Sequence, residues 1–287
     1  MRVMVMGRSG QLARSLAERA SKLELIALGR PELDLECPGS ADAAIRQFGP
    51  HIVINAAAYT DVDGAEVEPG RAFRINAEAA GEIASAARAL DIPVIHLSTD
   101  YVFDGSVTGA LIEDARTAPL GVYGRSKLEG EEQVSAANPK HMILRTAWIY
   151  SHFGRNFVKS IYEAAESRGE LSVVADQRGS PTSAMDLSDA LIALLDRWDG
   201  QGSTYHLAGS GEASRYELAC EVMAVRNRLG LHVAKVEPIE SDDWPGRAKR
   251  PRISILDCSK FERDFGIRLP EWRNSVAEVV QRLAAAR

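Results

Sequence analysis

The stretch RVMVMGRSGQLA, residues 2–13, decides how the rest of the chain is interpreted. Residues 2–6 form a short apolar run that ends at a glycine, which predicts a buried β-strand. Gly7 permits a tight turn, and helix-forming residues follow to about Ser21. This order of strand, glycine turn and helix is the context of a dinucleotide site, in which Gly10 lets the backbone approach a pyrophosphate. The spacing GxxGxxA also suits an ordinary strand–helix connection, but its position at the start of the chain favours the cofactor.

Apolar strands and helical segments alternate along the first half of the chain. Strands are predicted over 24–28, 52–55 and 93–97 and in the run that ends at Thr146, with helices over 40–48, 66–90 and from Tyr123 onward. This alternation predicts an α/β fold with a doubly wound parallel sheet of the Rossmann type. Because ligands bind at the carboxyl ends of such strands, the residues directly after each strand are the candidates for a site.

The residues after the second and third strands bear on the choice of cofactor. An acidic residue after the second strand would bind a ribose 2′-hydroxyl and favour NADH, whereas an arginine can accept a 2′-phosphate. The chain has Gly29 and Arg30 there, which favours NADPH, with NADH as the alternative. An exposed arginine in a loop before Pro31 fits the same pattern. The third strand runs into three alanines, 56–58, whose small side chains would let a cofactor lie against the backbone.

Three residues carry the candidate chemistry. Tyr123 and Lys127 open a helical run, so both can point to one small volume. A phenol with a pKa of about 10 is a poor acid at neutral pH, and a neighbouring ammonium would lower that pKa and make Tyr123 a usable proton donor. Thr99 follows the fourth strand, where its hydroxyl can donate to a carbonyl oxygen as negative charge develops. Taken alone, each residue also suits a helix surface or a turn.

The composition excludes several classes of protein. The 287 residues are 45% hydrophobic and carry a formal net charge of −6, which suits one or two globular domains and no nucleic-acid partner. One basic cluster departs from this balance: Arg247, Lys249, Arg250 and Arg252. The 3 cysteines and 6 histidines show no metal-binding or disulfide spacing, so we expect no metal. With no signal peptide and no apolar run of membrane length in the sequence, we expect a cytoplasmic protein without a membrane partner.

Four motifs together resemble one family, the extended short-chain dehydrogenases/reductases: Gly7-x-x-Gly10, NAAA at 55–58, STDYVF at 98–103 and Tyr123-x-x-x-Lys127. The similarity continues through LRTAWIY at 144–150, GRNFV at 154–158, DQRGSPT at 176–182 and the tail over 250–272. Within the family, the chain is similar to enzymes that reduce a C4 keto group with NADPH. The resemblance therefore implies the reduction of dTDP-4-dehydro-6-deoxy-L-mannose to dTDP-L-rhamnose.

The resemblance also implies roles for individual residues. Thr99, Tyr123 and Lys127 match the catalytic residues of the family. With Gly7 and Arg30, the expected cofactor-binding residues are Gly10, Gln11, Leu12, Asp34, Leu35, Ala58, Tyr59, Thr60, Tyr123 and Lys127. The expected substrate-binding residues are Val62, Thr99, Asp100, Tyr101 and Trp148. Trp148 taken alone would suit a core aromatic residue equally well.

Besides the missing acid at Gly29, three positions depart from the family pattern. Ser15 stands where some members carry a Glu that joins a magnesium-linked dimer, so no such dimer is expected and the oligomeric state stays open. Arg215 replaces a frequent aromatic residue and Ile253 a frequent Asn, which leaves the exact sugar open. Two alternatives therefore remain beside the expected nucleotide-sugar reductase. One is an epimerase or a reductase for another nucleotide sugar, and the other is a non-catalytic dinucleotide-binding regulatory subunit of the kind found with methionine adenosyltransferase.

The second half of the chain predicts a smaller α/β substrate domain over 151–287, after a dinucleotide-binding domain over 1–150. Helices are expected over 156–168, 186–198, 215–229 and 274–286, with short strands over 171–174 and 205–207. The resemblance implies that parts of 180–230 return to the first domain. Residues 242–254 contain Trp244-Pro245-Gly246 and the basic cluster, and are expected either to face a substrate diphosphate or to form a solvated charged loop.

Overall fold

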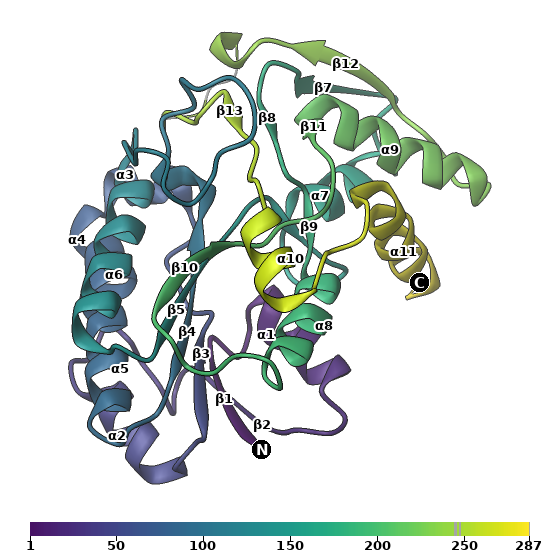
Figure 1. The fold of residues 1–287 in the computed structure, drawn as a ribbon. Helices are drawn as coiled ribbons and strands as arrows, with labels where there is room; N and C mark the ends of the chain where they lie inside the picture. Colours follow the sequence, from purple (N-terminus) through teal and green to yellow (C-terminus); the bar gives the residue numbers. More distant parts are fainter. Residues whose placement is uncertain (244–245, 247, 287) are drawn as a thin grey trace.

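A six-stranded sheet forms the centre of the protein in the computed structural model, which describes residues 1–243, 246 and 248–286 (Figure 1). The strand order is β10-β5-β4-β3-β1-β2, and every pairing is parallel. The strands are β1 (Arg2–Met6), β2 (Glu24–Leu28), β3 (Ile52–Asn55), β4 (Val94–Thr99), β5 (His141–Thr146) and β10 (Ser203–His206). The predicted doubly wound parallel sheet is therefore confirmed. Trp244, Pro245 and Arg247 of the predicted loop lie outside the described residues.

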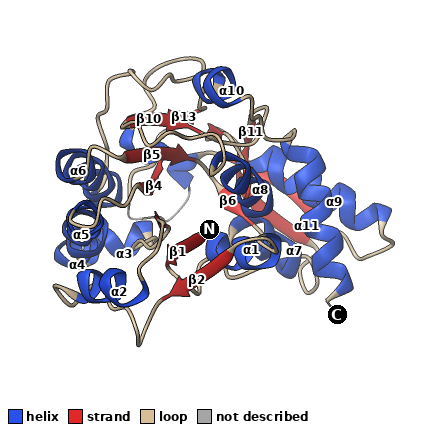
Figure 2. Cartoon of the chain, turned by 60° about the horizontal axis from the view of Figure 1, so that its bottom comes forward, coloured by secondary structure: helices blue, strands red, loops and turns tan. Residues whose placement is uncertain are grey.

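Helices cover both faces of this sheet because side chains along each strand alternate between the faces. Val3 and Val5 pack with α1 (Gln11–Arg19), α8 (Ala184–Leu194) and α10 (Ser259–Phe265). Met4 and Met6, fully buried as core residues, pack with α2 (Ser40–Phe48) and α5 (Ala79–Arg88) on the other face. Figures 1 and 2 show α5 and α6 (Val122–Ala137) side by side on that second face. Of the described helices, none has the length and apolar character needed to cross a membrane.

The strand order reverses at β1, which pairs with β2 on one side and β3 on the other. Neighbouring connections leave this point in opposite directions, so a crevice opens at the carboxyl ends of the strands. Gly7 follows β1 with a φ of +107°, and a Cβ there would lie 3.1 Å from the Ala57 nitrogen. Glycine is required at this turn on both counts.

The helical run predicted over about 66–90 is confirmed, but it is not one regular α-helix. The segment instead divides into α3 (Val62–Val67), α4 (Pro69–Phe73), a π-helical turn (Arg74–Glu78) and α5. Pro69 has no N–H to continue the preceding helix and starts a new one. Within the π-helical turn, Asn76 is buried, and it accepts from the Tyr59 nitrogen (2.8 Å) and donates to the Ser126 hydroxyl (3.0 Å). These contacts tie the loop after β3 to α6.

Part of the second half of the chain forms a separate core beside the sheet, whereas α8, α10 and β10 belong to the core of the main sheet. Helices α7 (Phe157–Ala164), α9 (Arg215–Arg228) and α11 (Trp272–Ala285) enclose it, at the right of Figure 2. The short strands pair as β7 (Glu170–Val174) with β12 (Lys235–Ile239), β6 (Ile149–Tyr150) with β9 (Thr182–Ser183), and β8 (Arg178–Gly179) with β11 (Ala213–Ser214) and β13 (Ile253–Ser254). Strand β10, predicted over 205–207, lies in the main sheet beside β5.

Candidate active site

Tyr123 reaches the end of β4 because helix α6 approaches the chain there without a side chain in between. A Cβ on Gly124 would lie only 2.2 Å from the Tyr101 carbonyl oxygen, so this approach requires glycine. The Tyr101 and Tyr123 rings meet edge to face at a centroid distance of 5.6 Å. Thr99, Asp100, Tyr123 and Trp148 line one cavity of about 430 Å³, hereafter called the catalytic cavity because it contains two of the three residues predicted to be catalytic.

Lys127 points at strand β4 rather than at the phenol. Its Nζ donates to the Leu97 carbonyl oxygen (2.6 Å) and lies 3.2 Å from His96 Nε2. Burial raises the pKa of Tyr123 above its ordinary value, an effect that contact with the Thr99 hydroxyl opposes. Lys127 is not among the groups that shift the pKa of Tyr123 in this geometry, and its expected action on the phenol stays a prediction. Burial also lowers the pKa of Lys127 itself, to about 8.

Asp100 is buried beside Thr99 in the 3₁₀ turn that follows β4 (Asp100–Val102). Its Oδ2 accepts from the Ser254 hydroxyl (2.6 Å) and its Oδ1 from the Thr99 hydroxyl (3.1 Å). Burial raises the pKa of Asp100 to about 6, although both hydrogen bonds oppose the shift. The carboxyl group is thus held at the cavity wall by its neighbour Thr99 and by Ser254, which lies 154 positions further along the chain than Asp100.

The crevice at the β1 switch point holds most of the residues predicted to bind a cofactor. It has a volume of about 760 Å³, and its lining includes Gly7, Gly10, Arg30, Asp34, Leu35, Ala58, Tyr59 and Thr60. Arg30 lies at its rim and pairs with Asp34 (Nε to Oδ2, 3.0 Å) and Glu36. Gly10 and Thr60 also line the catalytic cavity, so the two spaces are continuous.

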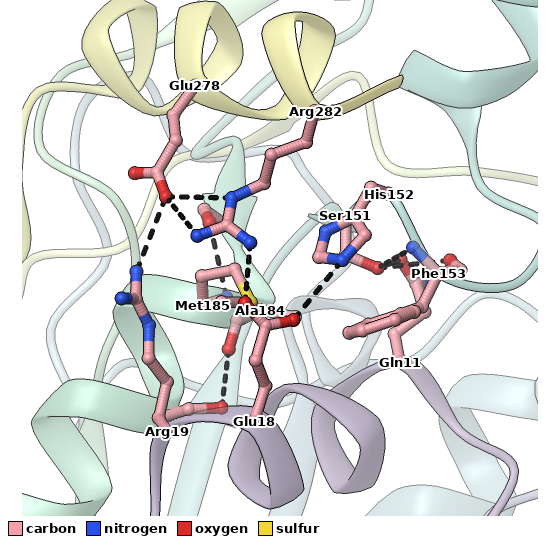
Figure 3. Close-up of polar contacts among 12 residues, drawn as sticks. Gln11, Glu18, Arg19, Ser151, His152, Phe153, Ala184, Met185, Glu278 and Arg282 are labelled. Carbon is pink, nitrogen blue, oxygen red and sulfur yellow. Dashed lines mark hydrogen bonds and ion pairs between the residues drawn. The ribbon is translucent and has the colours of Figure 1, made fainter. Parts of the chain in front are cut away.

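Gln11 and Leu12 line the catalytic end of this space. The Gln11 side chain accepts from the Ser151 hydroxyl (2.9 Å), which joins the start of α1 to the turn after β6. Figure 3 shows the contacts that continue from there: His152 lies 3.4 Å from Glu18, and Glu18 pairs with Arg282 of α11. These contacts connect helix α1, which follows the glycine turn, to the C-terminal helix α11.

A second cavity of about 410 Å³, hereafter the Arg215 cavity, shares Trp148 and Ile149 with the catalytic cavity. Val62 and Tyr101, both predicted substrate residues, also line it. Trp148 has a φ of +46° and packs so closely on Gly179 that a Cβ there would lie 2.6 Å from the indole ring. The Arg215 guanidinium covers the same ring, with its Cζ 3.6 Å from the ring centroid.

Arg215 is the main residue of this region that sequence reasoning did not assign to a site. Burial and the nearby Arg250 lower its pKa, and Tyr101 and Asp100 compensate only in part. Phe157, Ile161 and Val173 form the apolar wall of the cavity and were also not predicted. Their signal in the sequence was weak, because apolar residues on a helix and a strand suit an ordinary core equally well. The departure of Arg215 from the family pattern was the one available clue.

The predicted basic loop lies along an outer cavity of about 530 Å³, which Lys249, Arg250 and Arg252 line. Arg250 and Gln177 line the Arg215 cavity as well, so this outer space continues inward. Arg250 also pairs with Asp63 of α3 (2.6 Å), whose other oxygen accepts from the Ala248 nitrogen (2.8 Å). These contacts hold the described part of the loop against the entrance of the site.

Within the described residues, no group of three or more His, Cys, Asp or Glu side chains could hold a metal ion. Ser15, at the position of the family's dimer-linking Glu, is fully buried on α1. The absence of a magnesium-linked dimer remains a prediction.

The chain matches the family model described as RmlD substrate binding domain over residues 1–285. It is 46% identical to a dTDP-4-dehydrorhamnose reductase of Sinorhizobium fredii over 286 residues, which cover 98% of this chain and 97% of that protein. Two solved structures of proteins with that same name are similar throughout. The Clostridium acetobutylicum structure has a TM-score of 0.93 at 34% identity and covers 99% of this chain and 100% of its own. The Bacillus anthracis structure, in complex with NADP, has a TM-score of 0.92 at 32% identity and covers 98% and 99%. This chain belongs to the RmlD family of dTDP-4-dehydrorhamnose reductases.

Proposed function

We propose that this protein is an NADPH-dependent oxidoreductase that reduces the C4 keto group of dTDP-4-dehydro-6-deoxy-L-mannose to give dTDP-L-rhamnose. The observation that carries the proposal is the meeting of two spaces at Tyr123. The crevice of the glycine turn enters the catalytic cavity from one side, and the Arg215 cavity adjoins it at Trp148 on the other. The names of the full-length relatives and the NADP in one of the solved structures support the same reaction.

The crevice has the features that a dinucleotide phosphate requires. Gly7 and Ala57 leave no side chain between the turn and the backbone after β3, and the free N–H groups at the start of α1 favour an anion. Gly10, Ala58 and Thr60 would hold the pyrophosphate and its riboses, and Arg30 at the rim would bind the 2′-phosphate. When bound, the reduced nicotinamide supplies the hydride.

Tyr123 is the proton donor in this proposal. Because burial raises its pKa, the phenol stays protonated across the neutral range and holds its proton in place before each turnover. The alkoxide that develops at C4 is a strong base, and it would take the proton of Tyr123 as the hydride arrives. Thr99 lines the same cavity, and rotation of its hydroxyl away from Asp100 would direct a second hydrogen bond to that oxygen.

The Arg215 cavity suits a sugar joined to a nucleoside diphosphate. Trp148 and Tyr101 form the wall nearest the catalytic cavity, and Asp100 offers carboxylate oxygens to sugar hydroxyl groups. Arg215 and Arg250 bring two guanidinium groups to this space, where a diphosphate would supply negative charge beside the half-buried Arg215. The apolar wall of Phe157, Ile161 and Val173 would contact the nucleotide base.

A turnover assay tests the proposal directly. Purified protein, NADPH and the dTDP-linked keto sugar are mixed, and the absorbance of the reduced cofactor is followed. Tyr123→Phe should remove most turnover and keep NADPH affinity, whereas the control Tyr205→Phe, whose hydroxyl contacts Asp264 away from the site, should leave both unchanged. No oxidation of NADPH by protein that binds it would reject the proposed reaction, and an active Tyr123→Phe variant would reject the role of Tyr123.

A further inference from the structure

Behind the catalytic cavity, the buried side chains of Lys127, His96 and Asn55 form a row that ends at the backbone of the cofactor crevice. Lys127 Nζ lies 3.2 Å from His96 Nε2, and the opposite ring nitrogen of His96 lies 3.0 Å from Asn55 Nδ2. Asn55 and His96 face each other in the β3–β4 ladder, and all three residues are at most 2% exposed. The proposed mechanism leaves His96 without a role.

The protonation of Lys127 and the tautomer of His96 depend on each other through their hydrogen bonds. Asn55 Oδ1 accepts from the Ala57 nitrogen (3.3 Å), so its amide nitrogen is the atom directed at His96 Nδ1. His96 Nδ1 is then the acceptor of this hydrogen bond, and the ring proton of His96 resides on Nε2, which faces Lys127. The Nε2–H group of His96 and a Lys127 ammonium are both donors and cannot bond to each other. This arrangement therefore suits a neutral Lys127 amine, which has a lone pair to accept from Nε2–H and still donates to the Leu97 carbonyl oxygen.

A charged Lys127 requires the opposite arrangement. Nε2 must then accept from the ammonium, the ring proton moves to Nδ1, and Asn55 turns its amide oxygen toward it. The Ala57 nitrogen, which belongs to the backbone that lines the cofactor crevice, then loses its contact with Asn55. The row therefore has two self-consistent states that differ by one proton on Lys127.

The surroundings of Lys127 place the change between these states near pH 8. Burial lowers the pKa of Lys127 to about 8, and the carboxylate of Glu131 on the same helix opposes this shift. Glu131 is itself held by Arg145 of β5 (2.7 Å) and Ser98 of β4 (2.5 Å). Burial, and after it the charge of Lys127, lower the pKa of His96 well below its ordinary value, so the ring stays neutral and responds through its tautomer.

We propose that His96 is a positioning residue that accepts a hydrogen bond from the Lys127 ammonium, keeps that amine charged during turnover, and transmits its protonation state through Asn55 to the cofactor-facing backbone. The effect on turnover rests on the proposed function. The tautomer change is a property of the free protein and is tested without any reaction.

Nuclear magnetic resonance of protein carrying ¹⁵N-labelled histidine measures the tautomer. The His96 signals are identified by their loss in His96→Gln. As the pH rises past about 8, the His96 proton should move from Nδ1 to Nε2, and in Lys127→Met it should stay on Nε2 at every pH. A tautomer that does not change with pH in the unsubstituted protein, or that changes equally in Lys127→Met, overturns the proposal.

Kinetics separate positioning from a purely structural role. Because the family resemblance places the charged Lys127 among the catalytic residues, kcat of the unsubstituted protein should fall on the alkaline side near pH 8 as Lys127 loses its proton. His96→Leu removes the acceptor and should move this limb to lower pH by about one unit, since a hydrogen bond to a charged group is of that order. His96→Gln, which keeps an acceptor oxygen, should restore most of the profile.

His206→Leu is the matched control, because His206 is also a buried histidine of the main sheet but contacts the Leu111 carbonyl oxygen instead. It should leave the alkaline limb in place. An unmoved limb in His96→Leu, with only a uniform loss of kcat, would assign His96 a structural role and reject the proposal. If the unsubstituted protein shows no turnover, the proposed function fails, while the tautomer measurement still decides the inference about His96.

Discussion

Replacing Gly179 by alanine should displace Trp148 and lower the rate of turnover without lowering the affinity for NADPH. A Cβ at this position would lie 2.6, 2.8 and 2.9 Å from three atoms of the indole ring. Non-bonded carbon atoms pack at about 3.5–4.0 Å, so the ring has to retreat by about 1 Å. The Arg215 guanidinium already covers the ring at 3.6 Å. Because a shift of about 1 Å in a positioning group costs up to about 100-fold in rate, we expect kcat/KM for the keto sugar to fall by about 10- to 100-fold.

The assay is steady-state turnover together with a fluorescence titration of NADPH. Gly169→Ala is the matched control, since it makes the same chemical change where nothing lies within 4 Å of the added carbon. It should leave kcat/KM unchanged. If Gly179→Ala has the kcat/KM of the control, or if it loses NADPH affinity in proportion, Trp148 does not form the substrate wall that we assign to it.

Three further predictions concern the cofactor, the core and the pH dependence of stability. Arg30→Ala should raise the Kd for NADPH more than that for NADH, and equal effects on both would exclude a contact with the 2′-phosphate. Glu131→Gln should destabilise the protein by about 3–5 kcal/mol in denaturant unfolding, because it leaves Arg145 buried without its partner, whereas Asp42→Asn in an exposed pair should cost less than about 1 kcal/mol. Since burial raises the pKa of Asp100 from 3.8 to about 6, the native state binds that proton more tightly than the unfolded state does, and the contribution of Asp100 to stability should fall as the pH rises through this range. Asp100→Asn should flatten that part of the curve, and an unchanged slope would contradict the buried carboxyl group.

The sequence was sufficient for the sheet because its strands are short, apolar and separated by helices of ordinary length. The alternation of Val3 and Val5 with Met4 and Met6 places each residue on a defined face, and both faces are covered as expected. The division of residues 66–90 into separate helices could not be predicted from the sequence in the same way. Its parts are all helical locally, whereas the π-helical turn is held by contacts of Asn76 with Tyr59 and Ser126, which are far away in sequence.

In the site, too, the features set by neighbouring residues could be predicted from the sequence, and those set by residues far away in the chain could not. Residues that directly follow strands, such as Gly7 and Thr99, could be predicted because the carboxyl edge of a parallel sheet is one place in space. The direction of the Lys127 side chain could not, because it depends on a carbonyl oxygen and an imidazole on β4. Arg215 comes from the second half of the chain, and only the folded structure places its charge beside Trp148.

The packing of the second half explains why the chain does not divide cleanly at residue 150. Leu187, Leu191 and Leu194 of α8 cover Val3 and Val5 of the main sheet, and β10 completes the edge of that sheet beside β5. A fragment that ends at 150 would leave this apolar face open to water, at a cost of about 25 cal/mol for each Å² uncovered. The same fragment would lack Gly179 and Arg215, which hold Trp148 in its strained backbone conformation. The two halves therefore depend on each other both for the core and for the wall at which the cofactor crevice meets the substrate cavity.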